Sequence, residues 1–445
     1  MTSEEATRRD WAGLPWNVLY SVLTRVPSLQ DYLRFSSVCK PWKSAAESDN
    51  RGRIATGHNQ PPLLLVPTQD RSRESRALYS AAAAAGNKLI VPNLNLPVPH
   101  HHRISCCGSS HGWLAFTELD YSVTLYNPFT RAQIRLPRFK TMPEFVADPA
   151  VIHPRIRNLP EFPADPCFPY YMVKKVVLSA DPSVFPDDYV AAALVGGNGS
   201  LAVVRAGEKE WRHVTAWAAD HCCRDNNPYK DAMYLLMFGL LRDVVFHGGG
   251  GGGSMIYTTG DRGLLARVNL ALLELELELV VPPWFPDRLL DRVDAYRYLV
   301  ESSDGRDLFM VVRLDERMMG LGDRSCITTK DFKVFKLHQE TTSRRLRFVE
   351  VADLQGDAVF VGDNNHSTAV LASAAGGGGC KPDSIYYTYD FTWVFPLGLG
   401  RHDMGVFSVK DKEISSHYVP TPAQNLGMPP PIWILPTVPP QLEFN

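Results

Sequence analysis

The sequence lacks any uninterrupted apolar run of the roughly 18 residues that a membrane-spanning helix needs. It also lacks a charge excess, because 46 Lys and Arg residues face 48 Asp and Glu residues, for a net charge of −2. That balance argues against a general attraction to nucleic acid or to an anionic membrane surface. The first residues, MTSEEATRRD, are too polar for a signal-peptide core. We therefore expect a protein of the cytoplasm or nucleus that binds neither nucleic acid nor membrane.

Cysteine is scarce as well, with eight residues in a chain of 445 and no C-x-x-C pair, so neither a disulfide scaffold nor a zinc finger is predicted. Histidine and cysteine do cluster at 100–111 (HHHRISCCGSSH) and at 221–223 (HCC). Adjacent cysteines, however, seldom both reach one tetrahedral zinc ion. The glycine runs at 248–253 and 376–379 lack the Lys-Ser or Lys-Thr that completes a phosphate-binding loop. We expect free thiols and no metal or other cofactor.

Residues 108–112, GSSHG, match the G-x-S-x-G pattern of a hydrolase nucleophile. That chemistry requires a helix directly after the serine, so that the hydroxyl stands exposed on a strained turn. The residues that follow, WLAFTEL, have the composition of a strand instead. We therefore predict no catalytic residues, and we expect the protein not to be an enzyme.

The first fifty residues have the most regular pattern in the chain. Pro15 suits the first turn of a helix, and apolar residues then recur at helical spacing: Val18, Leu19, Val22, Leu23 and Val26. Pro27 ends this segment, Ser28 caps a second one, and a short third helix starts at Trp42. Three helices this short bury too little surface to be stable alone. The module is therefore either a cap on the following domain or one half of an interface with a partner.

The same segment resembles an F-box, whose frame is Leu-Pro, paired apolar positions, Leu-Arg-Phe, and Val-Cys-Lys-x-Trp. The order, spacing and residue types agree together at Leu14-Pro15, Leu19, Val22-Leu23, Leu33-Arg34-Phe35, Val38-Cys39-Lys40 and Trp42. The resemblance implies docking onto a Skp-type adaptor and, through it, a cullin. It also implies an adaptor-binding set of nine residues, namely Leu14, Pro15, Leu19, Val22, Leu23, Leu33, Phe35, Val38 and Trp42. Leu14, Pro15, Leu19 and Leu23 would press into the adaptor, while Phe35, Val38 and Trp42 would hold the helices together and complete the contact.

After residue 50 the helical pattern gives way to short apolar runs separated by Gly, Asp, Asn and Ser. Asp304-Gly305, between YRYLVESS and RDLFMVVRLD, predicts a hairpin turn. LLELELELVV alternates apolar and acidic residues, as a strand with one solvated face does. Trp113, Trp211 and Trp393 lie in such runs and are expected in the core. Antiparallel units of about 40–50 residues recur, which predicts a β-propeller. A β-sandwich is the alternative, although a single sandwich seldom contains so many strands.

The predicted fold is thus mainly β, with a small three-helix F-box module at 8–50, a linker at 51–60 and a propeller-like domain at 61–420. The proline-rich tail at 421–445 is incompatible with regular helix or central strand, and we expect it to be extended, packed on the domain or mobile. The runs SSHGWLAF, LYNPFT and IYYTYD…DMGVFSVKD resemble the kelch-like domain of unknown function that follows the F-box in a large plant family.

Together the two resemblances imply a substrate-recognition subunit of an SCF-type ubiquitin ligase, in which the propeller binds an unknown target protein. Two alternatives stay open. One is a propeller hydrolase or carbohydrate-binding protein whose N-terminal helices are only a cap. The other is an F-box protein that binds the adaptor but acts as a scaffold or competitor rather than in a ligase.

Overall fold

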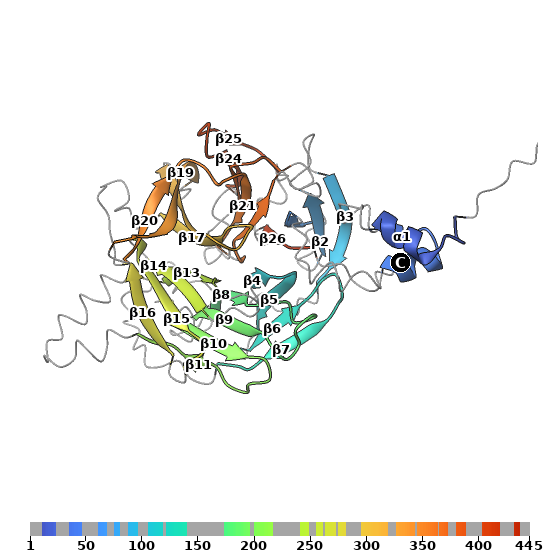
Figure 1. Ribbon diagram of the computed structural model, residues 1–445, viewed down its shortest axis with the longest axis horizontal. Coiled ribbons are helices and arrows are strands. Elements are labelled where there is room, and N and C mark those ends of the chain that lie inside the picture. Colours follow the sequence, from blue (N-terminus) through green and yellow to red (C-terminus); the bar gives the residue numbers. More distant parts are fainter. Residues whose placement is uncertain are drawn as a thin grey trace, which may run out of the picture.

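A computed structural model describes residues 11–23, 35–46, 61–68, 75–80, 88–96, 106–118, 122–139, 173–195, 200–216, 241–248, 255–260, 263–272, 275–281, 295–318, 326–342, 345–363, 365–372, 380–388, 403–418 and 431–436. Within these ranges the strands form six sheets arranged as the blades of a ring, and a helical module lies beside the ring at β3 (Figure 1). This confirms the predicted fold class, a mainly β chain with a propeller after N-terminal helices. None of the described helices is long and apolar enough to cross a membrane.

The first three blades are each written here from the inner strand outward. Blade 1 consists of β26 (Ile432–Ile434), β1 (Leu63–Pro67), β2 (Ser75–Ser80) and β3 (Lys88–Asn95). Blade 2 consists of β4 (Cys106–Ser110), β5 (Trp113–Thr117), β6 (Val123–Tyr126) and β7 (Gln133–Leu136). Blade 3 consists of β8 (Val173–Leu178), β9 (Val190–Val195), β10 (Ser200–Arg205) and β11 (Arg212–His213).

The other three blades complete the ring. Blade 4 consists of β13 (Leu241–Phe246), β14 (Met255–Gly260), β15 (Leu265–Asn269) and β16 (Glu276–Val281), with β12 (Thr215–Ala216) parallel to β16 at its edge. Blade 5 consists of β17 (Tyr296–Glu301), β18 (Leu308–Met318), β19 (Cys326–Gln339) and β20 (Leu346–Val351). Blade 6 consists of β22 (Thr368–Leu371), β21 (Asp357–Val361), β23 (Ser384–Tyr387), β24 (Gly405–Ser408) and β25 (Ile414–Ser415).

The blades pack face to face because many of their strands are apolar on both sides. Side chains alternate along a strand, so successive residues enter the two neighbouring interfaces. In β8, Val176 and Leu178 pack against blade 2, while Val177 packs against blade 4. All six residues of β9 are buried for the same reason. Trp113 and Trp211 lie in the core between blades 2 and 3, as predicted, whereas Trp393 lies outside the described residues.

Two predicted strand signals are confirmed. The acidic-apolar run contains β16, where Glu278 is exposed and pairs with Arg267 on β15 at 2.7 Å. The Asp304-Gly305 turn joins β17 to β18, and Gly305 has a φ of 71°, which glycine adopts without strain.

Blade 6 departs from the simple antiparallel plan that the sequence suggested. The run AVFVG follows the last strand of blade 5 in the sequence, but it forms β21 of blade 6. The next strand, β22, lies inside β21, and β23 then pairs parallel to β21 on the other side. A pattern of apolar runs gives no pairing order, so this rearrangement leaves no signal in the sequence.

The C-terminal strand β26 closes the ring. Ile432–Ile434 lie in the proline-rich segment assigned to a tail beyond the propeller, yet they pair antiparallel with Leu63–Leu65 of β1. β26 has a partner on one side only, which is the edge position that neighbouring prolines tolerate. The strand joins residues more than 360 positions apart, so it holds the first blade to the last part of the chain.

Charged side chains also link the blades near the axis. The buried Lys175 ammonium on β8 lies 2.5 Å from the Asp243 carboxylate on β13. The second oxygen of Asp243 accepts the backbone N–H of Leu299 on β17 at 2.8 Å. Burial raises the pKa of Asp243, and the adjacent ammonium opposes that shift. One carboxylate thus joins blades 3, 4 and 5.

We predict that Lys175→Met lowers the free energy of unfolding by about 3–5 kcal/mol, because it leaves the Asp243 carboxylate buried without its cation. The Lys175→Met/Asp243→Asn double variant should recover a large part of that loss. Urea denaturation measures both. Lys333→Met is the control, because the Lys333 ammonium lies 3.9 Å from the carboxylate of an exposed Glu350. This substitution should lower the free energy of unfolding by less than about 1 kcal/mol. If the double variant loses as much free energy of unfolding as the two single variants together, Lys175 and Asp243 are not coupled.

A second prediction concerns ring closure by β26. Trp433 is 2% exposed and packs edge-on against Phe360 of blade 6 at 5.1 Å between ring centroids. Trp433→Ala should therefore lower the free energy of unfolding by about 3–5 kcal/mol. Trp16→Ala, at a tryptophan that is 49% exposed, should change it by less than about 0.5 kcal/mol. Equal denaturation midpoints for the two variants would show that β26 does not hold the ring.

Candidate functional site

The N-terminal helical module begins where the sequence indicates. The carbonyl of Pro15 accepts the backbone N–H groups of Val18 and Leu19 at 3.0 and 3.1 Å, which forms the first turn of α1 (Trp16–Leu23). Residues 35–36 and 40–46 are also helical. Leu33 lies outside the described residues, as does the stretch 24–34, so the count of three helices stays a prediction.

The module has an apolar core of its own that continues into the propeller. Leu19, Leu23 and Phe35 are buried in one cluster with residues of blades 1 and 2, among them Leu65 and Phe116. The ring centroid of Phe35 lies 4.5 Å from that of Trp42. The Trp42 indole donates its N–H to the carbonyl of Trp11 at 2.8 Å. These contacts hold the helical segments together and fix them to the ring.

Several other apolar side chains of the module face solvent. Pro15 is exposed and Leu14 half-buried, and five larger side chains are between 38% and 53% exposed: Trp16, Val18, Tyr20, Val22 and Val38. On α1, Trp16 and Tyr20 flank the buried stripe on one side, while Val18 and Val22 flank it on the other. We call the exposed set Trp16, Val18, Tyr20, Val22 and Val38 the helical face. So much exposed apolar surface on one short segment is typical of an interaction site.

Leu33 aside, the other eight residues of the F-box set divide into three groups. Pro15, Val22 and Val38 are exposed, and Leu14 and Trp42 are half-buried. Leu19, Leu23 and Phe35 are buried inside the chain, so in this conformation the two leucines are not accessible to a partner. The predicted set does not include Trp16 and Tyr20, which are exposed on one flank of α1. Their size and their place on the first helix were the available signal.

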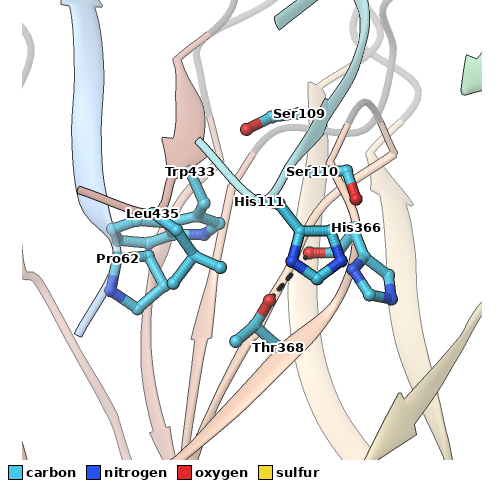
Figure 2. Close-up of a pocket in the computed structure, with 8 residues that line it drawn as sticks. All are labelled: Pro62, Ser109, Ser110, His111, His366, Thr368, Trp433 and Leu435. Carbon is cyan, nitrogen blue, oxygen red and sulfur yellow. Dashed lines mark hydrogen bonds between the residues drawn. The ribbon is translucent and has the colours of Figure 1, made fainter. Parts of the chain in front are cut away.

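A second feature lies at one end of the central axis. A small pocket there is lined by side chains from blades 1, 2 and 6: Pro62, Ser109, Ser110, His111, His366, Thr368, Trp433 and Leu435 (Figure 2). The His111 and His366 ring centroids are 6.1 Å apart. The His366 backbone N–H donates to the Ser109 carbonyl at 2.7 Å, so the two blades meet directly at this end of the axis.

Burial dominates the electrostatics of this pocket. Burial, with smaller contributions from the neighbouring His111 and from Lys175, lowers the pKa of His366 to about 3. Burial also lowers the pKa of His111, although the carboxylates of Asp181 and Glu301 act in the opposite direction. Both imidazoles are therefore neutral at pH 7.

The serine pattern at 108–112 does not form a nucleophile elbow. Ser109 and Ser110 end strand β4, His111 and Gly112 make the turn, and strand β5 follows, as the composition predicted. The Ser110 hydroxyl accepts the Leu178 N–H at 3.1 Å and lies 3.4 Å from the Leu178 carbonyl. It is thus engaged in joining blades 2 and 3.

Comparisons with known proteins agree with these two parts. The model of the KIB1-4 β-propeller family matches residues 79–408, and the F-box domain model matches residues 11–54. Arabidopsis thaliana F-box protein SKIP23 is 26% identical over 450 residues, which cover 96% of this chain and 95% of SKIP23. Arabidopsis thaliana F-box protein At2g17036 is 24% identical over 447 residues, again covering 96% and 95%.

Among solved structures, the Cps50 (Swd1) β-propeller domain of Myceliophteria thermophila is 9% identical and covers 80% of this chain and 85% of its own, with a TM-score of 0.37. That likeness is too weak to add to the fold described above. The family match spans most of the propeller, and the relatives align along nearly the whole chain. The protein therefore belongs to the KIB1-4 β-propeller family and carries an F-box domain before its propeller.

Proposed function

We propose that this chain is the substrate-recognition subunit of an SCF-type ubiquitin ligase. The helical face binds a Skp-type adaptor and through it a cullin, while the propeller binds a target protein. The observation that carries the proposal is the helical face itself, which leaves two large aromatic and three aliphatic side chains in solvent. Buried aromatic and aliphatic anchors dominate the affinity of protein interfaces.

The chain's contribution in this function is positional and involves no bond chemistry of its own. Because Leu19, Leu23 and Phe35 share one core with blades 1 and 2, the adaptor and the target would be held in a fixed relative orientation. Fixing a target lysine near the ubiquitin donor replaces a bimolecular encounter with an intramolecular one. Cys39, Cys106, Cys107 and Cys380 are free thiols, which supports our placement of the complex in the cytoplasm or nucleus.

The test is co-purification of the full chain with a Skp-type adaptor. Trp16→Ala and Tyr20→Ala should each weaken the complex by about 2 kcal/mol, or about 30-fold, because each removes an aromatic anchor. The control is Phe185→Ala in the β8–β9 loop, since Phe185 is 48% exposed, as Tyr20 is, but lies on the propeller. This control should bind the adaptor like the wild type.

Two outcomes would argue against the proposal. No complex between adaptor and well-folded wild type would reduce the helices to a cap on the propeller. A complex that forms but supports no ubiquitination of any bound protein would instead favour the scaffold or competitor function.

A further prediction distinguishes the residues that bind the adaptor from those that stabilise the apolar core. Leu19→Ala should lower the free energy of unfolding by about 2–5 kcal/mol, because Leu19 is 1% exposed and its loss leaves a cavity. Tyr20→Ala, at the next residue, should cost less than about 1 kcal/mol in unfolding and act on adaptor binding instead. Thermal and urea denaturation of the two variants measure the difference. A Leu19→Ala variant that is as stable as the wild type but no longer binds the adaptor would instead show that Leu19 contacts the adaptor.

A further inference from the structure

The outer edge of blade 5 differs from the outer edges of the other blades. Three of the outer strands are short, since β7 has four residues and β11 and β25 have two each. The edge of β16 in blade 4 is occupied in part by β12, which pairs parallel to it. The helical module lies beside β3 of blade 1 (Figure 1). The outer strand of blade 5, β20, has six residues, and no described strand pairs with its other side.

The pairing of β20 with β19 shows which backbone groups point outward. The register runs the length of β20 without a bulge. Just before the strand, the Glu340 N–H donates to the Arg345 carbonyl at 2.9 Å, so these two residues form a hydrogen-bonded pair. In an antiparallel ladder such pairs alternate, and every second residue of an edge strand directs its N–H and C=O away from the sheet. In β20 these residues are Leu346, Phe348 and Glu350.

The side chains of β20 fix the strand to the blade on one side and are open to solvent on the other. Phe348 is buried in the cluster between blades 4 and 5. Side chains alternate along a strand, so Arg347 and Val349 project to the opposite side. There Arg347 is 61% and Val349 37% exposed. Arg345, two residues before Arg347, is exposed as well. This side of the edge thus offers one apolar side chain beside two guanidinium groups.

The neighbouring charges leave the Val349 side of the edge basic. The Arg347 guanidinium lies 3.9 Å from the Glu340 carboxylate, and both side chains are largely exposed. An exposed ion pair of this length contributes little to stability, so a carboxylate of a partner can replace it. Lys336 on β19, opposite Val349, pairs with Asp307 at 2.6 Å and adds no net charge.

The acidic residue of β20 projects to the other side of the strand. Glu350 follows the alternation of Phe348, and its carboxylate lies 3.9 Å from the Lys333 ammonium. It therefore leaves the positive charge of Arg345 and Arg347 in place. Two copies of β20 would bring like charges together, which disfavours pairing of this edge with a second copy of the chain. The same charges attract an acidic strand.

We propose that β20 binds an extended acidic segment of a partner protein, which adds a strand to blade 5. In this mode of recognition, main-chain hydrogen bonds supply affinity and the alternating side chains supply specificity. The three strand pairs of blade 5 are antiparallel, and we infer the same orientation for the added strand. In the function proposed above the segment belongs to the target protein, and in that respect the inference rests on that function.

The antiparallel orientation gives the segment a sequence pattern. Its residues opposite Val349, Arg347 and Arg345 are spaced by two, which gives the order apolar-x-acidic-x-acidic along the partner. Because β20 directs the backbone of Leu346 and Phe348 outward, the intervening residues of the partner exchange hydrogen bonds with them. The residues opposite Arg347 and Val349 form non-hydrogen-bonded pairs, in which the side chains of the two strands lie closest.

The experiment measures the binding of two labelled peptides to the full chain by fluorescence anisotropy. The acidic peptide is Thr-Val-Thr-Glu-Thr-Glu-Thr, and the basic peptide has lysine in place of both glutamates. The acidic peptide should bind more tightly, and its affinity should fall as salt is added. Arg347→Glu should weaken binding of the acidic peptide about tenfold and strengthen that of the basic one. Lys209→Glu, at an exposed lysine of the β10–β11 turn, should bind both peptides as the wild type does.

Two further changes test the backbone hydrogen bonds. N-methylation of the two threonines that would lie opposite Phe348 and Leu346 removes donors to β20, and it should abolish binding of the acidic peptide. N-methylation of the two glutamates, whose N–H groups point away from β20, should be tolerated. On the chain itself, Glu350→Pro removes an outward donor at an edge position that proline tolerates, and it should weaken binding. Glu350→Gln is the matched control and should bind at least as well as the wild type.

The proposal is overturned if the well-folded chain binds the acidic peptide no better than the basic one. It is also overturned if the threonine-methylated peptide binds as tightly as the unmodified one. Sedimentation of the wild type should show a monomer, and a dimer that Glu350→Pro dissociates would assign this edge to a second copy instead. Adaptor binding by the same preparations is a separate readout, because the helical face lies on other elements. A chain that binds the adaptor but not the peptide would refute this inference and leave the proposed adaptor binding intact.

Discussion

The antiparallel pairing of β26 with β1 is the interaction on which the rest of this molecule depends. It joins Leu63–Leu65 to Ile432–Ile434 and so closes a ring of six blades. The three residues of β26 alternate: Trp433 packs toward Phe360 and Tyr386 of blade 6, while Ile432 and Ile434 enter the cluster of blades 1 and 2. A strand of three residues thus fills two blade interfaces at once.

The cluster that receives Ile432 and Ile434 also receives the helical module, because it contains Leu19, Leu23 and Phe35. The N-terminal and C-terminal parts of the chain therefore share one core. This arrangement explains how α1 can expose aromatic side chains on its flanks and still be held in place. Its buried stripe supplies the attachment to the ring, and the flanks are left for a partner.

Whereas the apolar faces of the blades pack by burying side chains, buried polar groups between the blades require hydrogen-bond or ionic partners. Two of them find their partners on neighbouring blades: Asp243 with Lys175 and Leu299, and Arg313 of blade 5 with Asp403 and the Thr388 carbonyl at 2.8 and 2.9 Å. Buried charges need such partners, since an unpaired one costs several kcal/mol, on the order of the stability of a domain. His366 Nε2 and Trp433 Nε1, which both line the axial pocket, are among the buried side-chain atoms of the described residues that have no hydrogen-bond partner.

The sequence by itself determined the class of the fold and the position of the helical module. The period of two in runs such as the one around β16, the turn at Asp304-Gly305 and the proline-bounded helix at Trp16–Leu23 are local signals, fixed by side-chain alternation and backbone preference. The parallel place of β23, the strand within the proline-rich end, the burial of Leu19 and the meeting of His111 with His366 depend on contacts between distant residues. Only the closed ring brings those residues together, because a local pattern specifies that a side chain is apolar or polar but not which neighbour it will have.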